Sequence, residues 1–146
     1  GADRVPEMPE GLDVECVEHP FNCKKYGRCT ATFIKYTGRW GCSPSAIEHC
    51  AKSKICTTKG LCAFKPDLET GPGCVAKPSG CAQSVDCKKR GHCSAVEQEC
   101  RPRLTRHCTD SEICKTEGKC HLHPGEDDLL AECVSRIPVL DGMGSP

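Results

Sequence analysis

Large apolar side chains are sparse along this chain and fall into no long periodic pattern. Leu, Ile, Val, Met, Phe, Trp and Tyr together account for 29 of the 146 residues. Ordering a chain costs roughly 1–2 kcal/mol of conformational entropy per residue, and so few apolar groups cannot easily offset that cost. We therefore expect covalent cross-links to support the fold. No apolar run approaches the length that crosses a membrane, so we expect no transmembrane segment.

The polar residues predict a short helix in each of four places. Ser53, Ser84 and Ser111 each stand three residues before a cysteine, where a hydroxyl caps the first turn. In the first place Pro20 takes this position, which suits the start of a helix. A glycine follows four residues after each of these cysteines and fits the left-handed position that ends a helix. These glycines are Gly27, Gly60, Gly91 and Gly118.

The segments that follow these helices differ in character. Residues 30–40 are rich in β-forming side chains around Thr37-Gly38, which predicts a small hairpin. Residues 63–73 contain several Pro and Gly and predict an irregular loop. Residues 94–99 leave room for little more than a turn. Residues 126–132 begin with three acidic residues and predict a second short helix.

Sixteen of the residues are Cys, a proportion typical of a disulfide scaffold. No two cysteines are closer than six positions, whereas zinc and iron–sulfur sites use close pairs. The even count and the spacing therefore favour disulfides, and disulfides indicate an oxidising compartment: outside the cell, at the cell surface or in the periplasm. The chain opens with a polar, Pro-rich stretch, which we interpret as a mature start after removal of a signal.

The cysteines form four groups of four, and the spacing repeats from group to group. In every group five residues separate the second cysteine from the third, and the fourth of these five is always the glycine named above. We expect an N-terminal arm, four repeats with their linkers, and a C-terminal arm. The predicted boundaries are 1–15 for the first arm, 16–49 for repeat 1, 50–80 for repeat 2, 81–107 for repeat 3, 108–133 for repeat 4 and 134–146 for the last arm.

The fold class predicted from these features is a small disulfide-rich fold. It has four tandem repeats, each a short helix plus a loop or hairpin held by two disulfides. We expect the first cysteine to pair with the third and the second with the fourth, while pairing of neighbours (first with second, third with fourth) stays open. The expected bonds are Cys16–Cys29, Cys23–Cys42, Cys50–Cys62, Cys56–Cys74, Cys81–Cys93, Cys87–Cys100, Cys108–Cys120 and Cys114–Cys133. Pro44, Pro78 and Pro102 suggest stiff linkers between separate beads.

The charges are segregated although the net charge is zero. Residues 1–15 carry −4, repeats 1 to 3 carry +3 each, and repeat 4 carries −5. The cations gather near the ends of the predicted helices and predict a basic face that binds a protein or an anionic polymer at the cell surface. Self-association through the acidic ends is a further option, whereas nucleic acid is not expected because aromatic residues are few. The proposed basic residues are Lys24, Lys25, Lys59, Lys88, Lys89 and Arg90.

Catalytic and cofactor motifs are missing from the sequence. It contains no nucleophile elbow, phosphate loop or His-Glu-x-x-His. His121-Leu-His123 would place two imidazoles on one face of a strand, but two ligands rarely make a metal site. We therefore expect no enzyme, no cofactor and no metal.

The repeat resembles a known group of exported proteins. Residues 81–93 and 108–120 follow the pattern Cys-x5-Cys-Lys-x2-Gly-x-Cys. This pattern is similar to the tandem cysteine-rich repeats of predicted exported proteins and lipoproteins of myxobacteria and their relatives. The resemblance covers residues 16–133 and implies an exported, bacterial repeat protein without implying an activity. Repeat 1 departs from the pattern by one extra residue before Cys23 and by Pro20 in place of Ser.

Two functions follow from the sequence. The first is a structural or interaction module at the cell surface or outside the cell, possessing a basic central face and belonging to a larger assembly. The alternative is a secreted effector, such as a protease inhibitor or a toxin-like ligand. In that case the apolar hairpin side chains Phe33, Tyr36 and Trp40 would form its contact site.

Overall fold

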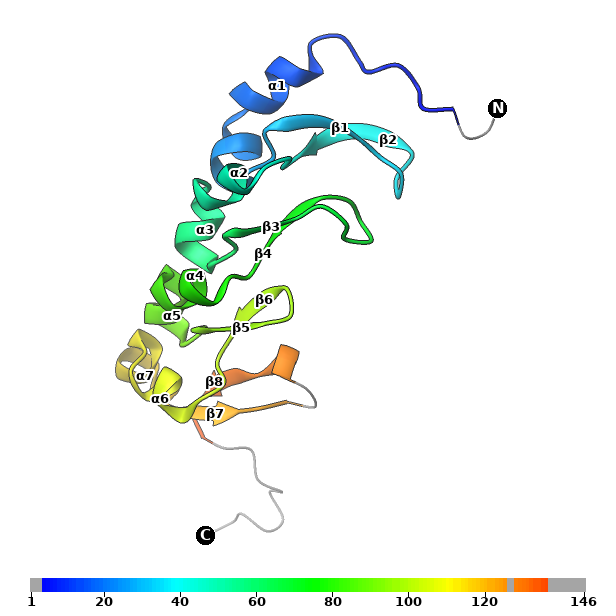
Figure 1. The fold of residues 1–146 in the computed structure, drawn as a ribbon. Coiled ribbons are helices and arrows are strands. Elements are labelled where there is room, and N and C mark those ends of the chain that lie inside the picture. The colour runs from blue at the N-terminus through cyan, green and yellow to red at the C-terminus, as the bar shows by residue number, and fades with distance from the viewer. Residues whose placement is uncertain (1–3, 126–127, 137–146) are drawn as a thin grey trace. The chain divides into compact units, whose positions relative to one another are not determined.

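The computed structural model describes residues 4–125 and 128–136. The chain divides into two compact units. Unit 1 contains Gly1–Thr57 and Leu61–Val75, and unit 2 contains Thr58–Gly60 and Ala76–Pro146. In each unit, short helices lie beside two-stranded hairpins (Figure 1). The predicted class, a small disulfide-rich fold of short helices and hairpins, is confirmed.

All sixteen cysteines are oxidised, and every bond stays within its own group of four, as expected. Such extensive cross-linking is compatible with an extracellular or periplasmic, oxidising location. In each group the first cysteine bonds to the fourth and the second to the third. The bonds are Cys16–Cys42, Cys23–Cys29, Cys50–Cys74, Cys56–Cys62, Cys81–Cys100, Cys87–Cys93, Cys108–Cys133 and Cys114–Cys120.

The predicted pairing was therefore wrong, and so was its rival of neighbouring pairs. Eight predicted bonds do not form: Cys16–Cys29, Cys23–Cys42, Cys50–Cys62, Cys56–Cys74, Cys81–Cys93, Cys87–Cys100, Cys108–Cys120 and Cys114–Cys133. The reason lies in the chain reversal after the second cysteine. Gly91 takes a φ of 77°, and its N–H donates to Cys87 O at 2.9 Å while His92 N–H donates to Asp86 O. This Schellman-type ending turns the third cysteine back onto the second.

Each repeat contains two short helices rather than the one that was predicted. The first helix carries the first cysteine, and the second helix carries the second cysteine. The first-cysteine helices are α1 (Leu12–Glu18), α2 (Ile47–Ala51), α4 (Pro78–Gln83) and α6 (Thr105–Thr109). The second-cysteine helices are η1 (Pro20–Lys25), α3 (Lys54–Lys59), α5 (Val85–Arg90) and α7 (Glu112–Glu117).

The predicted serine caps are confirmed, and each serine also ends the preceding helix. Ser84 Oγ accepts a bond from Cys87 N–H at 3.0 Å and donates one to Cys81 O at 2.9 Å. The same pair of bonds occurs at Ser53 and Ser111. Because all three serines are buried, each hydroxyl satisfies two main-chain groups that water cannot reach.

Repeat 1 solves the same problem differently. His19 Nδ1 accepts the bond from Phe21 N–H at 3.2 Å, and Pro20 occupies the first turn as predicted. The helix that follows, η1, is a π-helix rather than an α-helix. Its wider turn accompanies the extra residue that repeat 1 carries before Cys23, in line with the π-bulge as a one-residue insertion.

Every repeat ends in a two-stranded antiparallel hairpin, although only the first was predicted. The hairpins are β1 (Thr30–Ile34) with β2 (Arg39–Ser43), β3 (Ala63–Lys65) with β4 (Gly73–Val75), β5 (Ser94–Val96) with β6 (Glu99–Arg101), and β7 (His121–His123) with β8 (Glu132–Val134). The expected irregular loop and the expected turn are thus only the tips of hairpins. The helix predicted over 126–132 is also wrong for residues 128–132, where a 3-10 turn η2 (Asp128–Leu130) leads into β8. Residues 126 and 127 lie outside the described part of the chain.

Neighbouring repeats pack directly on one another at the recurring glycine of the motif. A Cβ added to Gly91 would lie 2.6 Å from His107 O, immediately before repeat 4, and 2.8 Å from Cys133 Sγ of repeat 4. Pro44 and Pro102 are buried, and Pro78, although exposed, belongs to helix α4, so none of the three is a hinge between separate beads. The picture of separate beads is therefore wrong, because main chain of one repeat touches the disulfide of the next.

The predicted N-terminal arm is partly structured. Its last residues, from Leu12, belong to α1. Trp40 Nε1 of β2 donates a hydrogen bond to Pro6 O at 2.7 Å, which holds the preceding segment against the first hairpin. Of the C-terminal arm, residues 137–146 lie outside the described part of the chain.

The glycine contact can be tested with a matched pair in unit 2. Gly91 and Gly118 have nearly the same φ, 77° and 71°, but a Cβ at Gly118 meets no atom of the described residues within 4 Å. Gly91→Ala should therefore destabilise unit 2 by about 1–3 kcal/mol more than Gly118→Ala, since both bear the left-handed penalty and only the first adds a clash. Denaturant unfolding of the oxidised variants, followed by circular dichroism, measures the difference. Equal destabilisation would show that φ alone selects glycine at this position.

The disulfide pairing makes a separate prediction. Cys87→Ser should leave one free thiol, at Cys93, because these two cysteines bond to each other. Alkylation of the folded variant with iodoacetamide, followed by reduction and peptide mapping, locates that thiol. A label at Cys100 instead would contradict the pairing seen in the structure.

Candidate functional site

The part of the chain that the structure describes contains no cluster of side chains suited to bind a metal ion. Over residues 4–125 and 128–136, no three His, Cys, Asp or Glu side chains come together as ligands. His121 and His123 do lie in an extended strand, β7, where they pair with Val134 and Glu132 of β8. None of the helices described is long and apolar enough to cross a membrane.

The predicted basic residues lie at the ends of the second-cysteine helices, and most are exposed. Exposed members are Lys24, Lys59, Lys88, Lys89 and Arg90. Lys25 differs because it is half-buried: its Nζ lies 5.2 Å from the ring centre of Phe21 and 5.3 Å from that of Tyr26. Lys25 is therefore engaged in cation–π contacts within its own repeat and is less available to a partner. Lys24 belongs to unit 1 and Lys88 to unit 2, and a single basic face that includes both stays a prediction.

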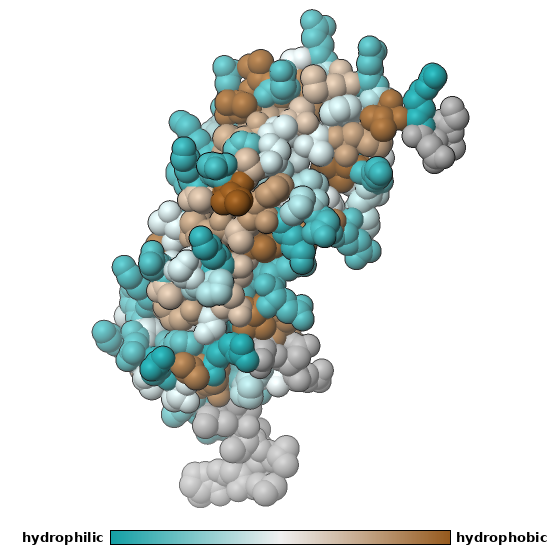
Figure 2. All heavy atoms as spheres, in the orientation of Figure 1, coloured by the Kyte–Doolittle hydropathy of each residue, from teal (hydrophilic) through white to brown (hydrophobic). Residues whose placement is uncertain are grey.

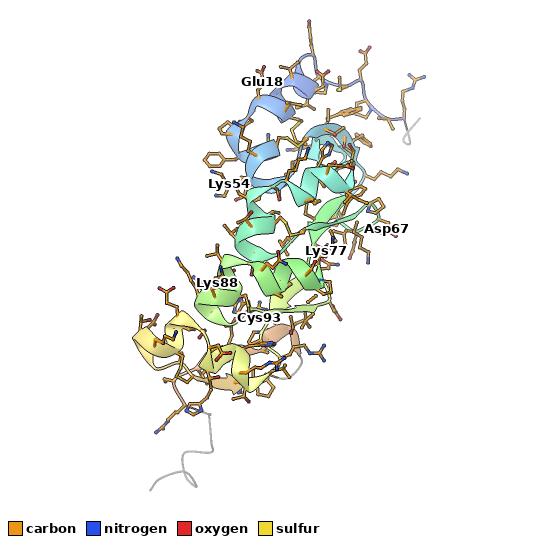
Figure 3. All side chains as sticks on the ribbon, turned by 60° about the vertical axis from the view of Figure 1, so that its left-hand side comes forward. Glu18, Lys54, Asp67, Lys77, Lys88 and Cys93 are labelled. Atoms are coloured by element: carbon orange, nitrogen blue, oxygen red, sulfur yellow. A yellow bond between two sulfur atoms is a disulfide. The ribbon has the colours of Figure 1, made fainter. Side chains whose placement is uncertain are left out.

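Helix α5 gives the clearest view of these cations. Lys88, Lys89 and Arg90 are three consecutive exposed residues, and Lys88 extends away from the helix in Figure 3. Among the described residues, no ion pair joins Lys88 or Lys89 to a carboxylate. The next two residues, Gly91 and His92, are buried. Lys88 and Lys89 thus lie on a helix whose end is fixed by packing, and neither forms an ion pair with a described carboxylate.

The predicted aromatic hairpin forms a second candidate surface, in unit 1. Phe33 and Trp40 are cross-strand partners with ring centres 6.0 Å apart, whereas Tyr36 at the tip is 65% exposed. Because the Trp40 indole N–H is bonded to Pro6 O, that ring serves mainly to hold the hairpin and the preceding segment together. The three predicted residues therefore share a hairpin but not a role.

A shallow hollow of about 330 Å³ lies between the first two hairpins of unit 1. Phe33, Ile34 and Tyr36 contribute one wall, and Pro66 and Leu68 of the β3–β4 loop contribute the other. One cation and one carboxylate, on Lys35 and Glu69, also line it. This combination of apolar walls with two charges suits a short peptide segment better than a small polar substrate. On the face shown in Figure 2, hydrophobic residues otherwise lie in small groups among hydrophilic ones.

A partly buried polar network in unit 2 was not found from the sequence. Glu132 of repeat 4 forms an ion pair with Arg101 of repeat 3 and a 3.0 Å contact with His92 Nε2, also of repeat 3. The hydrogen bond from His92 holds the pKa of Glu132 below its ordinary value, with the nearby Arg101 adding to the effect against partial burial. Arg101 also pairs with Glu99, while its Nε is buried without a partner. These contacts join repeats 3 and 4, and the polar groups that form them bond mainly to one another rather than to a ligand.

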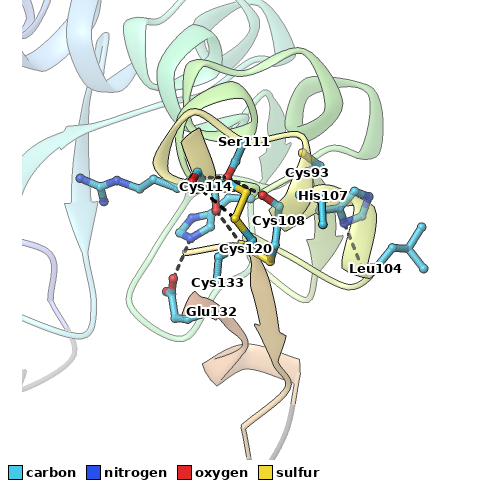
Figure 4. Close-up of a disulfide and its surroundings, with 12 residues drawn as sticks. Cys93, Leu104, His107, Cys108, Ser111, Cys114, Cys120, Glu132 and Cys133 are labelled. Carbon is cyan, nitrogen blue, oxygen red and sulfur yellow. Dashed lines mark hydrogen bonds and ion pairs between the residues drawn. A yellow bond between two sulfur atoms is a disulfide. The ribbon is translucent and has the colours of Figure 1, made fainter. Parts of the chain in front are cut away.

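Histidines that precede a first cysteine act as helix caps. His107 Nδ1 accepts N–H bonds from Arg103 at 3.1 Å and Leu104 at 3.2 Å, as Figure 4 shows in part. Burial and the neighbouring Arg106 lower the pKa of His107, which favours the neutral ring that accepting requires. His49 accepts the equivalent bond from Ser45 N–H at 3.0 Å. These side chains are therefore structural and are not poised for catalysis.

The network around Glu132 predicts a pH dependence. Because the pKa of Glu132 is lower in the folded chain than in the unfolded one, its carboxylate stabilises unit 2 above its ordinary pKa. That stabilisation disappears as the pH falls through the folded-state pKa. The protection factors of the β7–β8 amides, which are the exchange rates corrected for the intrinsic rate at each pH, should therefore be lower at pH 3 than at pH 7, and Glu132→Gln should remove most of this difference.

At pH 7 the same substitution should raise exchange about two- to fivefold, as expected for a partly exposed pair that contributes about 0.5–1 kcal/mol. Glu97→Gln supplies the control, since Glu97 is exposed at the β5–β6 turn of the same unit. If both variants show the same response to pH, the loss of protection at low pH comes from carboxylates other than Glu132.

Comparison with known proteins adds no relative: no family model, no curated protein and no solved structure matches this chain.

Proposed function

We propose that this chain is a non-catalytic interaction module of an extracellular or periplasmic compartment, and that it holds an anionic partner through the exposed cationic ends of its second-cysteine helices. The observation that carries this proposal is α5, which exposes Lys88, Lys89 and Arg90 while Gly91 directly after them is buried. The resemblance to exported bacterial repeat proteins also supports an extracytoplasmic role, at a cell surface or within an assembly.

The local geometry favours binding of a charged partner because it limits the entropy cost. Two disulfides and the buried glycine fix the helix end of repeat 3, so only the lysine side chains lose freedom on binding. Charges that lack an internal ion pair also need not break one to meet an anion. Lys24 in repeat 1 and Lys59 in repeat 2 occupy similar helix ends, so a long anion engages several sites and gains avidity.

A secreted effector is the second candidate, and the hollow in unit 1 favours it. There the exposed Tyr36 and the walls from Pro66 and Leu68 would receive a short segment of a target protein. This contact is mainly apolar, so its affinity would change little with salt. The response to salt therefore separates the two functions.

The experiment measures binding of dextran sulfate, with uncharged dextran as the blank, by the full oxidised chain. Lys24, Lys59, Lys88 and Lys89 are changed together to Ser; Lys25 is kept because it contacts two rings. We expect about a tenfold or greater loss of affinity in 0.1 M salt, since four weak ionic contacts of about 0.3–1 kcal/mol are removed.

The matched control changes Lys35, Lys52, Lys65 and Lys77 to Ser, which are equally exposed and alter the net charge equally. We expect this variant to retain most of the affinity, and the unchanged chain to lose its binding in 1 M salt, where the Debye length falls to about 3 Å. Equal losses in the two variants would reduce the effect to net charge and contradict a site at the helix ends.

A further inference from the structure

The disulfides of unit 2 fall into two classes that differ in burial. The first class joins the first and fourth cysteines of a repeat, and its members Cys81–Cys100 and Cys108–Cys133 are buried, with no cysteine more than 7% exposed. The second class joins the second and third cysteines. All four cysteines of its members, Cys87–Cys93 and Cys114–Cys120, are partly exposed. Because a thiolate exchanges with a disulfide only when it reaches one of the two sulfur atoms, the second class contains the accessible sites for this reaction.

The Cys87–Cys93 bond lies among positive charges. Cys87 and Arg90 are three positions apart in α5, so their Cβ atoms lie about 5–6 Å from each other on one side of the helix. Lys88 and Lys89 belong to the same turn, and neither pairs with a carboxylate of the described residues. Between positions 86 and 92, one acidic residue stands against three basic ones. The surroundings of this disulfide are therefore net positive.

Repeat 4 contains the same bond with a different charge beside it. Cys114 holds in α7 the place that Cys87 holds in α5, and six positions separate the bonded cysteines in both repeats. Three positions after Cys114 stands Glu117 rather than an arginine, and its Oε1 lies 3.3 Å from Lys119 Nζ. This ion pair balances the charges nearest to the sulfur. The two bonds are therefore a matched pair that differs in local charge.

Local charge acts on disulfide exchange in two ways. The attacking thiolate bonds to one sulfur, and the other sulfur leaves as a thiolate, which nearby cations stabilise. A more stable thiolate leaves faster. The same cations raise the local concentration of an attacking thiol that carries a negative charge. Both effects favour Cys87–Cys93 over Cys114–Cys120, and the first places the departing thiolate on Cys87, beside Arg90.

We infer that Cys87–Cys93 is a modification site at which small anionic thiols form a mixed disulfide. The incoming thiolate bonds to Cys93 Sγ, the bond between Cys93 and Cys87 breaks, and its electron pair leaves with Cys87 as a thiolate. One disulfide replaces another and one thiolate replaces another, so the reaction needs no oxidant. This inference goes beyond the proposed anion binding and does not rest on it, because here the cations act on a covalent bond rather than on a bound polymer.

The chain around the bond stays in place when the bond opens. Gly91 and His92 are buried, and their N–H groups donate to main-chain carbonyls of α5 at 2.9 and 3.3 Å. The buried Cys81–Cys100 bond continues to hold the repeat. The Cys87 thiolate therefore remains close to Cys93 and expels the added thiol once the excess is removed, so the modification is reversible.

The test treats the full oxidised chain with three thiols of similar size: 2-mercaptoethanesulfonate, which is anionic, 2-mercaptoethanol, which is uncharged, and cysteamine, which is cationic. Samples are quenched early with N-ethylmaleimide, and peptide mapping measures the adduct at each cysteine. Each rate is divided by the rate of the same thiol with bis(2-hydroxyethyl) disulfide, which removes differences in intrinsic reactivity.

At low salt we expect the anionic thiol to react about threefold or more faster than the cationic one at Cys87–Cys93, and both to react about equally at Cys114–Cys120. The added thiol should be on Cys93 and the maleimide on Cys87. The charge preference should disappear in 1 M salt, where the Debye length is about 3 Å. Removal of the thiol before the quench should restore the original disulfide.

Two substitutions test the source of the preference. Arg90→Gln and Lys77→Gln each remove one exposed positive charge from unit 2, but Lys77 stands before α4 rather than in α5. We expect Arg90→Gln to lower the preference at Cys87–Cys93 about twofold, as for the loss of one exposed charge, and Lys77→Gln to leave it unchanged.

Four outcomes overturn the inference: no adduct on the unaltered chain, an equal charge preference at both disulfides, an equal effect of the two substitutions, or an added thiol found chiefly on Cys87. Binding of dextran sulfate is a separate measurement that none of these outcomes alters, so the two proposals fail separately.

Discussion

The fold depends on a close approach of main chain to disulfide at one glycine in each of the first three motifs. At Gly60 two constraints coincide: its φ is 75°, and an added Cβ would lie 2.7 Å from Cys81 N. The first constraint alone admits Asn or Asp with some strain, whereas the second admits no side chain at all. The same residue thereby ends a helix, returns the third cysteine to the second, and leaves room for the next repeat. A chain with little apolar surface gains its packing from this arrangement rather than from a hydrophobic core.

The features predicted correctly from the sequence are those determined by neighbours along the chain. Ser84 caps the helix that begins beside it, and Gly91 ends that helix seven residues later, so both roles are predictable from the local sequence. The disulfide pairing was not readable in this way, because it depends on where the chain goes after the glycine. Two of the first-cysteine helices, α2 and α6, were missed for a related reason: the side chain that satisfies their first N–H groups is an imidazole, such as His49, which reaches back to Ser45 N–H rather than forward.

The candidate binding surfaces likewise divide into features set by neighbouring residues in the sequence and features set by tertiary packing. Exposure of Lys88 and Lys89 follows from their place at the end of a short helix, and the prediction needed no tertiary information. Lys25 was predicted to be exposed in the same way, but it is half-buried. Its ammonium group lies over the rings of Phe21 and Tyr26, two aromatic residues that the other repeats lack at these positions. The Glu132 network could not be predicted at all, since it joins residues 31 and 40 positions apart that only the packing of repeats 3 and 4 brings together.

Variation among the repeats is confined to places where it leaves the contacts between them unchanged. The fourth cysteine always lies opposite the residue two positions after the third, as with Ala31 and Cys42 or Ala95 and Cys100. Residues added beyond that register lengthen only the tip of the hairpin, so β5–β6 turns within two residues while β1–β2 extends to Tyr36. Disulfide and glycine stay in place in both. Differences in binding can therefore arise at the hairpin tips and helix ends without any cost to the contact that holds the repeats together.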